Sequence, residues 1–175
     1  MKKILIPVLV ALALGAAAVQ AQSQKIGYVN STKIFQEYPA AQEAQRRIDA
    51  IGKPFQDSLD AMQKALQTEY EDYQKKESMM NDAAKKTAQQ KILELQQRAT
   101  EYQREKFGNE GELARQTERI INPIRDKIKA AIAQVAKEEK YGFVFDKTEQ
   151  IQILLYGDPN QDLTFKVIDR LKRGR

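Results

Sequence analysis

Three carboxylates near the C-terminus have the spacing that comes closest to a chemical site. Asp146, Glu149 and Asp158 lie close in sequence around a predicted hairpin. Clustered carboxylates can bind a divalent cation or exchange protons with a substrate. Acidic residues in a turn more often solvate it and cap nearby backbone N–H groups. We favour this second interpretation.

The composition removes most other catalytic chemistry. The sequence contains no cysteine, histidine or tryptophan. Histidine is the commonest general base and the commonest transition-metal ligand in proteins. Neither a phosphate-binding glycine loop nor a nucleophile motif occurs. We therefore expect a protein that is not an enzyme, with no catalytic residues, no cofactor and no metal.

Apolar and aromatic residues in the middle of the chain could contact other polypeptides. Flexible methionine and amphipathic tyrosine side chains suit contact with apolar segments of many partners. The alternative is that these residues fill the seam between two helices, and we favour it for Tyr73 and Tyr102. For Met79 and Met80 the two interpretations are balanced. The candidate contact residues are Tyr70, Tyr73, Met79, Met80, Ile92, Leu95 and Tyr102.

A group of lysines surrounds the same central region. These four residues face only Glu77 and Asp82 as nearby acidic residues, and they could approach an anionic membrane surface or acidic partners over about a Debye length. Solubilisation of an exposed turn is the alternative that we favour. The basic tip consists of Lys75, Lys76, Lys85 and Lys86.

Residues 40–140 are predicted to form the helical element that carries these side chains. The segment is rich in Ala, Gln, Glu, Lys and Arg, which favour helix. Its apolar residues alternate in steps of three and four, the spacing of a narrow coiled-coil seam: Ile48, Ile51, Phe55, Leu59, Met62, Leu66 and Tyr73, then Ala88, Ile92, Leu95, Ala99 and Tyr102. Each helix then needs one partner along most of its length.

The helical segment is predicted to reverse direction near residues 79–86, where Asn81 and Asp82 offer turn and capping chemistry. At about 1.5 Å per residue, an arm of roughly 38 residues would project ~57 Å. Pro54 and Pro123 each predict a kink or a break in a helix. Gly108 and Gly111 weaken the returning helix between arm and base.

Short strands are predicted at both ends of the helical segment. Residues 25–30 form the first strand, and 143–146 and 151–156 form two more, because all three are rich in β-branched and aromatic residues. A turn at 157–159 follows, and Asp162 caps a final amphipathic helix. A lone strand leaves backbone N–H and C=O groups without hydrogen-bond partners, so the first strand must pair with the distant ones. The helical hairpin is then inserted between the paired strands.

The first 21 residues are predicted to be a secretory signal peptide. Lys2 and Lys3 precede an apolar run from Ile4 to Val19, and cleavage near Ala21 is expected. The mature chain then divides into a β body, 22–39 with 141–175, and a helical arm, 40–140. This body is small and lacks disulfides, so we expect several chains to associate through its strands.

The charge distribution argues against nucleic acid as a partner. The formal net charge is +5, of which Lys2 and Lys3 belong to the predicted signal peptide. Basic and acidic residues are otherwise interspersed, whereas a nucleic-acid-binding protein concentrates its basic residues on one face. Export would also separate the protein from nucleic acid.

KIGYVNSTKIF, the glutamine-rich helical middle, YGFVFD and YGDPNQDLTFKVIDRLK together resemble the Skp/OmpH family of periplasmic chaperones. The resemblance spans essentially the whole mature chain. It implies a homotrimer with a trimeric β core, whose helical arms enclose a cavity and hold unfolded outer-membrane β-barrel proteins without ATP. No residues here match a lipopolysaccharide site assigned to some members.

A second class of function fits part of the same pattern. A coiled-coil spacer or adaptor of the cell envelope would also contain two long helices. Such a spacer needs stiff, continuous heptads, and these are interrupted by Pro54, Gly108, Gly111 and Pro123. We therefore favour an ATP-independent holdase in the periplasm.

Overall fold

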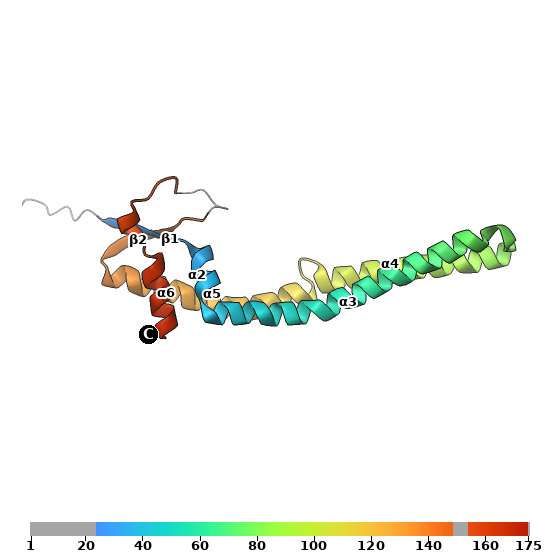
Figure 1. Ribbon diagram of the computed structural model, residues 1–175, viewed down its shortest axis with the longest axis horizontal. Coiled ribbons are helices and arrows are strands. Elements are labelled where there is room, and N and C mark those ends of the chain that lie inside the picture. The colour runs from blue at the N-terminus through green and yellow to red at the C-terminus, as the bar shows by residue number, and fades with distance from the viewer. Residues whose placement is uncertain (1–23, 149–153, 175) are drawn as a thin grey trace, which may run out of the picture.

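The computed structural model describes residues 24–148 and 154–174, and it is mainly helical with one small pair of strands, as the sequence predicts (Figure 1). The predicted signal peptide lies outside the described residues. The elements are β1 (Lys25–Val29), α2 (Ser31–Glu37), α3 (Pro39–Lys76), α4 (Asp82–Phe107), α5 (Glu112–Glu138), β2 (Tyr141–Asp146) and α6 (Thr164–Arg173), with short 3-10 turns at Glu77–Met79 and Pro159–Gln161.

β1 pairs with β2 from the C-terminal quarter of the chain, and the two strands run parallel. Ile26 lies opposite Phe143 and Tyr28 lies opposite Phe145. Parallel strands cannot be joined by a tight turn, so the connection between them must cross over. Here the crossover consists of α2, α3, α4 and α5. The strand pairing therefore requires the long helices to leave the body and return to it.

The predicted strand at 151–156 is wrong in its described part. Residues 154–156 have no strand structure, and 151–153 lie outside the described residues. The edge of β1 opposite β2 is instead occupied by Asp162, which forms an isolated bridge with Tyr28. Leu163 N–H also donates to Tyr28 O at 2.9 Å. The chain nearby passes close over Tyr28, since a Cβ added at Gly157 would lie 2.5 Å from that ring.

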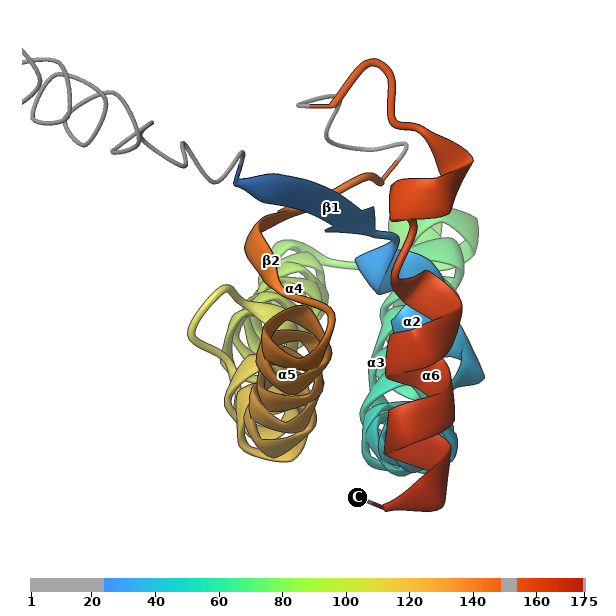
Figure 2. The same ribbon diagram turned by 90° about the vertical axis from the view of Figure 1, so that its left-hand side faces the viewer.

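The core of the body lies between the strands and the helices α2, α5 and α6 (Figure 2). Ile34 and Val167 are fully buried, and Leu163 is 1% exposed. α2 begins at a capping residue, because Asn30 Oδ1 accepts a hydrogen bond from Lys33 N–H at 2.8 Å. Asp146 at the end of β2 accepts another from Ser31 N–H at 3.0 Å. The end of one strand thus fixes the helix that follows the other.

The start of the final helix differs by one residue from the prediction. α6 begins at Thr164 and its N-cap position is Leu163 rather than Asp162. Asp162 Oδ1 still accepts a hydrogen bond from Thr164 N–H at 2.8 Å. Asp162 itself is held in extended backbone by its bridge to Tyr28, which moves the helix start one residue along the chain.

The arm consists of α3 lying beside α4, and it extends away from the body (Figure 1). The chain reverses at residues 77–81, at the beginning of the predicted window. Asn81 Oδ1 accepts a hydrogen bond from Ala84 N–H at 2.8 Å and so caps α4. At about 1.5 Å per residue, the 38 residues of α3 span ~57 Å.

The prolines and the glycines affect the long helices differently. Pro54 and Pro123 lie inside α3 and α5, so neither ends its helix. Both prolines are exposed, where water can satisfy the carbonyl groups that lose their helical donors. The returning helix does break between Gly108 and Gly111. A Cβ at Gly108 would lie 2.4 Å from the Arg104 carbonyl oxygen, so a side chain there would clash.

The last long helix ends slightly before its predicted boundary. α5 ends at Glu138 rather than at Lys140. Lys140 has a φ of 60°, in the left-handed region that lysine rarely adopts. This residue turns the chain from α5 into β2, and the left-handed turn explains why the helix stops before it.

Candidate functional site

The arm is held together by a narrow seam between α3 and α4. Leu59 and Ala99 are its most buried members, at 6% and 8% exposure. The other residues that the heptad pattern predicts for the seam are half-buried. Glu69 and Lys91 join the two helices by an ion pair of 2.7 Å. A two-helix arm has no third layer to cover it, so most of its surface remains in contact with solvent.

Tyr73 connects the two helices through its hydroxyl group. The oxygen accepts a hydrogen bond from Gln89 Nε2 at 2.8 Å, and the hydroxyl lies 3.0 Å from Glu77 Oε1. Partial burial in the seam is the main cause that raises the pKa of Tyr73, while the Gln89 hydrogen bond lowers it and Glu77 raises it. The phenol therefore stays protonated and donates to Glu77. This role is structural.

The predicted contact residues do not form one continuous patch. Four of them lie half-buried at the seam: Tyr73, Ile92, Leu95 and Tyr102. Tyr70 is 51% exposed beside the seam, and Met79 is 79% exposed at the turn. Met80 is half-buried next to it. The candidates thus divide into seam residues and separate exposed side chains.

Sequence reasoning missed one exposed apolar residue on the arm. Leu93 is 51% exposed on α4. It contributes to a shallow groove of about 340 Å³ together with Gln96, Gln97, Thr100, Glu101 and Arg104. Leu93 follows the seam residue Ile92 directly and breaks the alternation of seam and polar positions, and that signal could have identified it.

The four lysines of the predicted basic tip lie at the far end of the arm, on both sides of the turn. Lys75, Lys76 and Lys86 are exposed, and Lys85 is half-buried. Lys76 pairs with Asp72 at 3.6 Å within α3. Exposed pairs of this kind contribute little to stability. The structure therefore places exposed positive charge on both sides of the turn that carries Met79.

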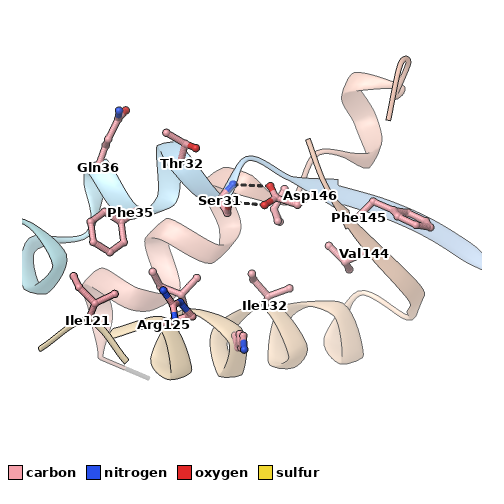
Figure 3. A pocket seen from close by; sticks show the side chains of 13 residues that line it. Ser31, Thr32, Phe35, Gln36, Ile121, Arg125, Ile132, Val144, Phe145 and Asp146 are labelled. Carbon is pink, nitrogen blue, oxygen red and sulfur yellow. Dashed lines mark hydrogen bonds between the residues drawn. The ribbon is translucent and has the colours of Figure 1, made fainter. Parts of the chain in front are cut away.

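The base of the arm carries an apolar groove between α2, α5 and β2 (Figure 3). Its volume is about 640 Å³, and Phe35, Ile132 and Val144 are among the residues that line it. Ser31 Oγ donates to Asp146 Oδ2 at its rim. The lining of the groove is mainly apolar, and this hydrogen bond joins α2 to the end of β2.

The outer face of the strand pair exposes several large apolar side chains. Ile26 and Phe143 are opposite each other in register and are 52% and 54% exposed. Phe145 is 41% exposed two residues further along β2. Leu155 and Tyr156 add two more exposed side chains from the following segment. The body therefore carries several large apolar side chains in contact with solvent.

The predicted carboxylate cluster is only partly described. Asp146 accepts hydrogen bonds from Ser31, and Asp158 Oδ1 accepts one from Asn160 N–H at 2.9 Å. Glu149 lies outside the described residues. Within residues 24–148 and 154–174, no group of acidic side chains has the arrangement to hold a metal ion. Over the same ranges, no helix has both the length and the apolarity to cross a membrane.

Taken together, the geometry defines a mainly helical protein in which a small parallel strand pair supports a long two-helix arm. The sequence family described as "Outer membrane protein (OmpH-like)" matches residues 25–171. The chain therefore belongs to the OmpH-like family, as its resemblance to Skp/OmpH chaperones indicates.

Relatives with a chaperone name match nearly the whole chain. "Chaperone protein Skp" of Yersinia enterocolitica is 28% identical and covers 98% of this chain and 100% of its own length. The protein of the same name from Photorhabdus luminescens is 25% identical over the same shares. That of Vibrio cholerae is 28% identical over 86% of this chain and 85% of its own.

A solved structure has a similar fold. It is a putative outer membrane chaperone (OmpH-like) from Caulobacter crescentus, with a TM-score of 0.63. The match covers 87% of this chain and 86% of that one, at 13% sequence identity. At that identity the likeness concerns the fold alone, and it extends over the body and the arm.

Proposed function

We propose that this protein is an ATP-independent holdase that binds unfolded outer-membrane β-barrel proteins between its helical arms and prevents their aggregation. The projecting arm is the observation that carries this proposal. Its seam is narrow and most of the surface of α3 and α4 is exposed, which leaves long polar surfaces available to another chain. The chaperone names of its relatives support the same role.

The arm suits a partner that must be both held and released. A large, dry and shape-matched interface would hold one folded partner tightly. Weak contacts distributed over several linked arms give retention through avidity, while each contact breaks easily. Binding then removes the client from the pool of colliding unfolded chains. No nucleotide is needed for this cycle, because release follows from the weakness of the single contacts.

Several arms require several chains, and we infer that the chain assembles as a homotrimer through its β body. Ile26, Phe143 and Phe145 form an exposed apolar face on the strand pair. Burial of such a face against further copies would supply the core that a small body without disulfides lacks. The number three is an expectation from the family resemblance. In that assembly the arms would surround a shared cavity.

We place the working protein in the periplasm. The apolar run between Lys3 and Ala21 has the length and flanking residues of a cleaved signal peptide, and outer-membrane proteins pass through that compartment in unfolded form. The mature chain would then consist of the body, whose core includes Ile128, Ala131 and Val135 of α5, and the arm formed by α3 and α4.

An aggregation assay tests the proposal. A urea-denatured outer-membrane β-barrel protein is diluted into buffer without nucleotide, in the presence of zero to equimolar trimer. We expect light scattering to fall in proportion to the added trimer and to remain low for minutes. Scattering that is unchanged at an equimolar amount, or that falls only when ATP is added, would contradict the proposal.

A further inference from the structure

The residues that follow the seam residues form a regular stripe along the outer arm. The seam positions there are Met62, Leu66, Glu69 and Tyr73 on α3 and Ala88, Ile92, Leu95, Ala99 and Tyr102 on α4, all buried or half-buried. The next residue is exposed and uncharged in these nine cases: Gln63, Gln67, Tyr70, Gln74, Gln89, Leu93, Gln96, Thr100 and Gln103. We name this set the glutamine face. The pattern stops at Leu59 and at half-buried Lys85, which are followed by Asp60 and Lys86.

Both halves of the glutamine face lie on the same side of the arm. Each residue of a helix is turned by about 100° from the one before it. α3 and α4 run in opposite directions. Viewed along the arm, the residue after a seam position is therefore rotated clockwise on one helix and anticlockwise on the other. Because the two seams face each other, both rotations bring that residue to the same side of the arm. Gln89, one step past the seam, reaches the seam residue Tyr73, and Lys91, one step before the seam, pairs with the seam residue Glu69.

The opposite side of the arm has a different chemistry. The residues that directly precede the seam positions include five charged side chains among nine: Ala61, Ala65, Thr68, Asp72, Thr87, Lys91, Glu94, Arg98 and Glu101. Glu101 and Arg104 also border the groove that contains Leu93, Gln96 and Thr100, so charge meets the glutamine face there. Lys, Arg and Glu favour helix about as strongly as Gln, so helix formation does not account for the lower charge of one side. Solubility does not explain the low charge of this side either, because charged side chains keep a surface soluble better than glutamine does.

We propose that the glutamine face is the surface on which the arm holds an unfolded polypeptide, mainly by hydrogen bonds to the backbone amides of the client. This inference rests on the proposed holdase function and assigns it to one side of the arm. A carboxamide side chain carries both donors and acceptors, as a peptide group does. Every unfolded chain presents such groups whatever its sequence, and an uncharged surface accepts acidic and basic segments alike.

Two of these glutamines donate hydrogen bonds to other side chains of the arm. Gln67 Nε2 donates to Glu71 at 3.0 Å, and Gln89 Nε2 donates to the Tyr73 hydroxyl at 2.8 Å. Tyr70 and Leu93, each 51% exposed, interrupt the glutamines with apolar surface on which a client side chain can rest. Exchange with water makes each such hydrogen bond weak in net terms, as reversible holding requires.

Site-specific photo-crosslinking tests which side contacts the client. A benzophenone side chain is placed at Gln96 on the glutamine face or at Gln90, which is also exposed on α4 but points away from the seam. The assembled full-length protein is then mixed with an unfolded outer-membrane β-barrel protein. We expect crosslinks to the client from position 96 that exceed those from position 90 several-fold. Equal or stronger crosslinking from position 90 would overturn the proposal.

A matched pair of substitutions tests the chemistry. Gln96→Glu and Gln90→Glu make the same change on the same helix, with similar helix propensity. We expect Gln96→Glu to raise the Kd for the client about threefold or more, the effect of one net hydrogen bond, and Gln90→Glu to leave it unchanged. Equal effects of the two variants at unchanged Tm would overturn the inference while leaving the holdase intact. Failure of the unmodified protein to bind the client would overturn both.

Discussion

The N–H group of Ser31 donates a hydrogen bond to Asp146 Oδ1 at 3.0 Å, and the Ser31 hydroxyl donates to Oδ2 of the same carboxylate. The two residues are separated by 115 positions in the sequence. They join the end of β2 to the start of α2, and so they fix the beginning of the long crossover to the strand at which the crossover returns. The arm depends on this closure for its attachment.

Asp146→Ala should destabilise the body. Loss of the carboxylate leaves the first N–H group of α2 without its acceptor, and the side chain is exposed, so we expect about 1 kcal/mol lower free energy of unfolding. Urea denaturation monitored by circular dichroism measures this free energy of unfolding. Asp169→Ala on α6, which removes an exposed pair with Arg173, is the control. An equal effect of the two variants would show that the Asp146 contact does not stabilise the closure.

Leu59→Ala should loosen the arm. Leu59 is 6% exposed at the seam, and truncation of a buried leucine removes its packing and leaves a cavity. We expect a loss of about 2 kcal/mol in the free energy of unfolding. Leu93→Ala on the exposed side of α4 should change it by less than about 0.5 kcal/mol. If both variants lose the same amount, the seam is not where the arm is stabilised.

Phe143→Lys should prevent self-association. Phe143 is 54% exposed on the outer face of the strand pair, and a lysine there would bury an unpaired charge if that face is an interface between chains. Size-exclusion chromatography with light scattering should give the mass of three chains for the unmodified protein and of one chain for the variant. Phe165→Lys, at an exposed position on α6, should remain a trimer. A variant at Phe143 that keeps the full mass would exclude this face from the interface.

The contribution of Glu139 should depend on pH. Lys166 Nζ donates to its carboxylate at 2.7 Å, and this hydrogen bond is the main cause that lowers the pKa of Glu139 below its ordinary value of 4.5. A lowered pKa in the folded state stabilises the fold above the ordinary value, and the contribution is lost as the pH falls through the lowered one.

The Tm of Glu139→Gln should therefore lie below that of the unmodified protein at pH 7, and the two should converge as the pH falls through and below the lowered pKa of Glu139. Glu118→Gln, at an exposed position on α5, is measured alongside as a control for the loss of a surface carboxylate. A difference in Tm that is independent of pH would mean that the packing of Glu139, rather than its charge, stabilises the contact between α5 and α6.

The parts of the fold that follow from local pattern were predictable from the sequence. Steps of three and four place Leu59 and Ala99 at the seam, and Asn81 marks the reversal of the chain through its capping chemistry. The pairing of the first strand with a distant one follows because its backbone N–H and C=O groups need hydrogen-bond partners. The predicted strand at 151–156 was wrong over 154–156, because β-branched residues indicate a strand without showing that a neighbouring edge is free. Asp162 occupies that edge.

The candidate site was less predictable than the fold. The heptad pattern identifies Tyr73 and Ile92 as seam residues, but it does not show which side of a two-helix arm faces a client. The glutamine face becomes visible only when α3 and α4 are placed side by side, because its two halves are far apart in the sequence. Leu93 could have been found from its position after Ile92, as an apolar residue where the pattern expects a polar one.

The central claim is that the arms hold unfolded chains, and a comparison of client states tests it most directly. A fluorescently labelled outer-membrane β-barrel protein is titrated with the trimer in buffer without nucleotide, once as the unfolded chain and once folded in detergent micelles, and anisotropy gives both Kd values. We predict binding of the unfolded chain at least about a hundredfold tighter than any binding of the folded one, a difference of ~2.7 kcal/mol. Equal affinity for the two states, or binding of the folded protein alone, would contradict a holdase and favour an adaptor of the cell envelope.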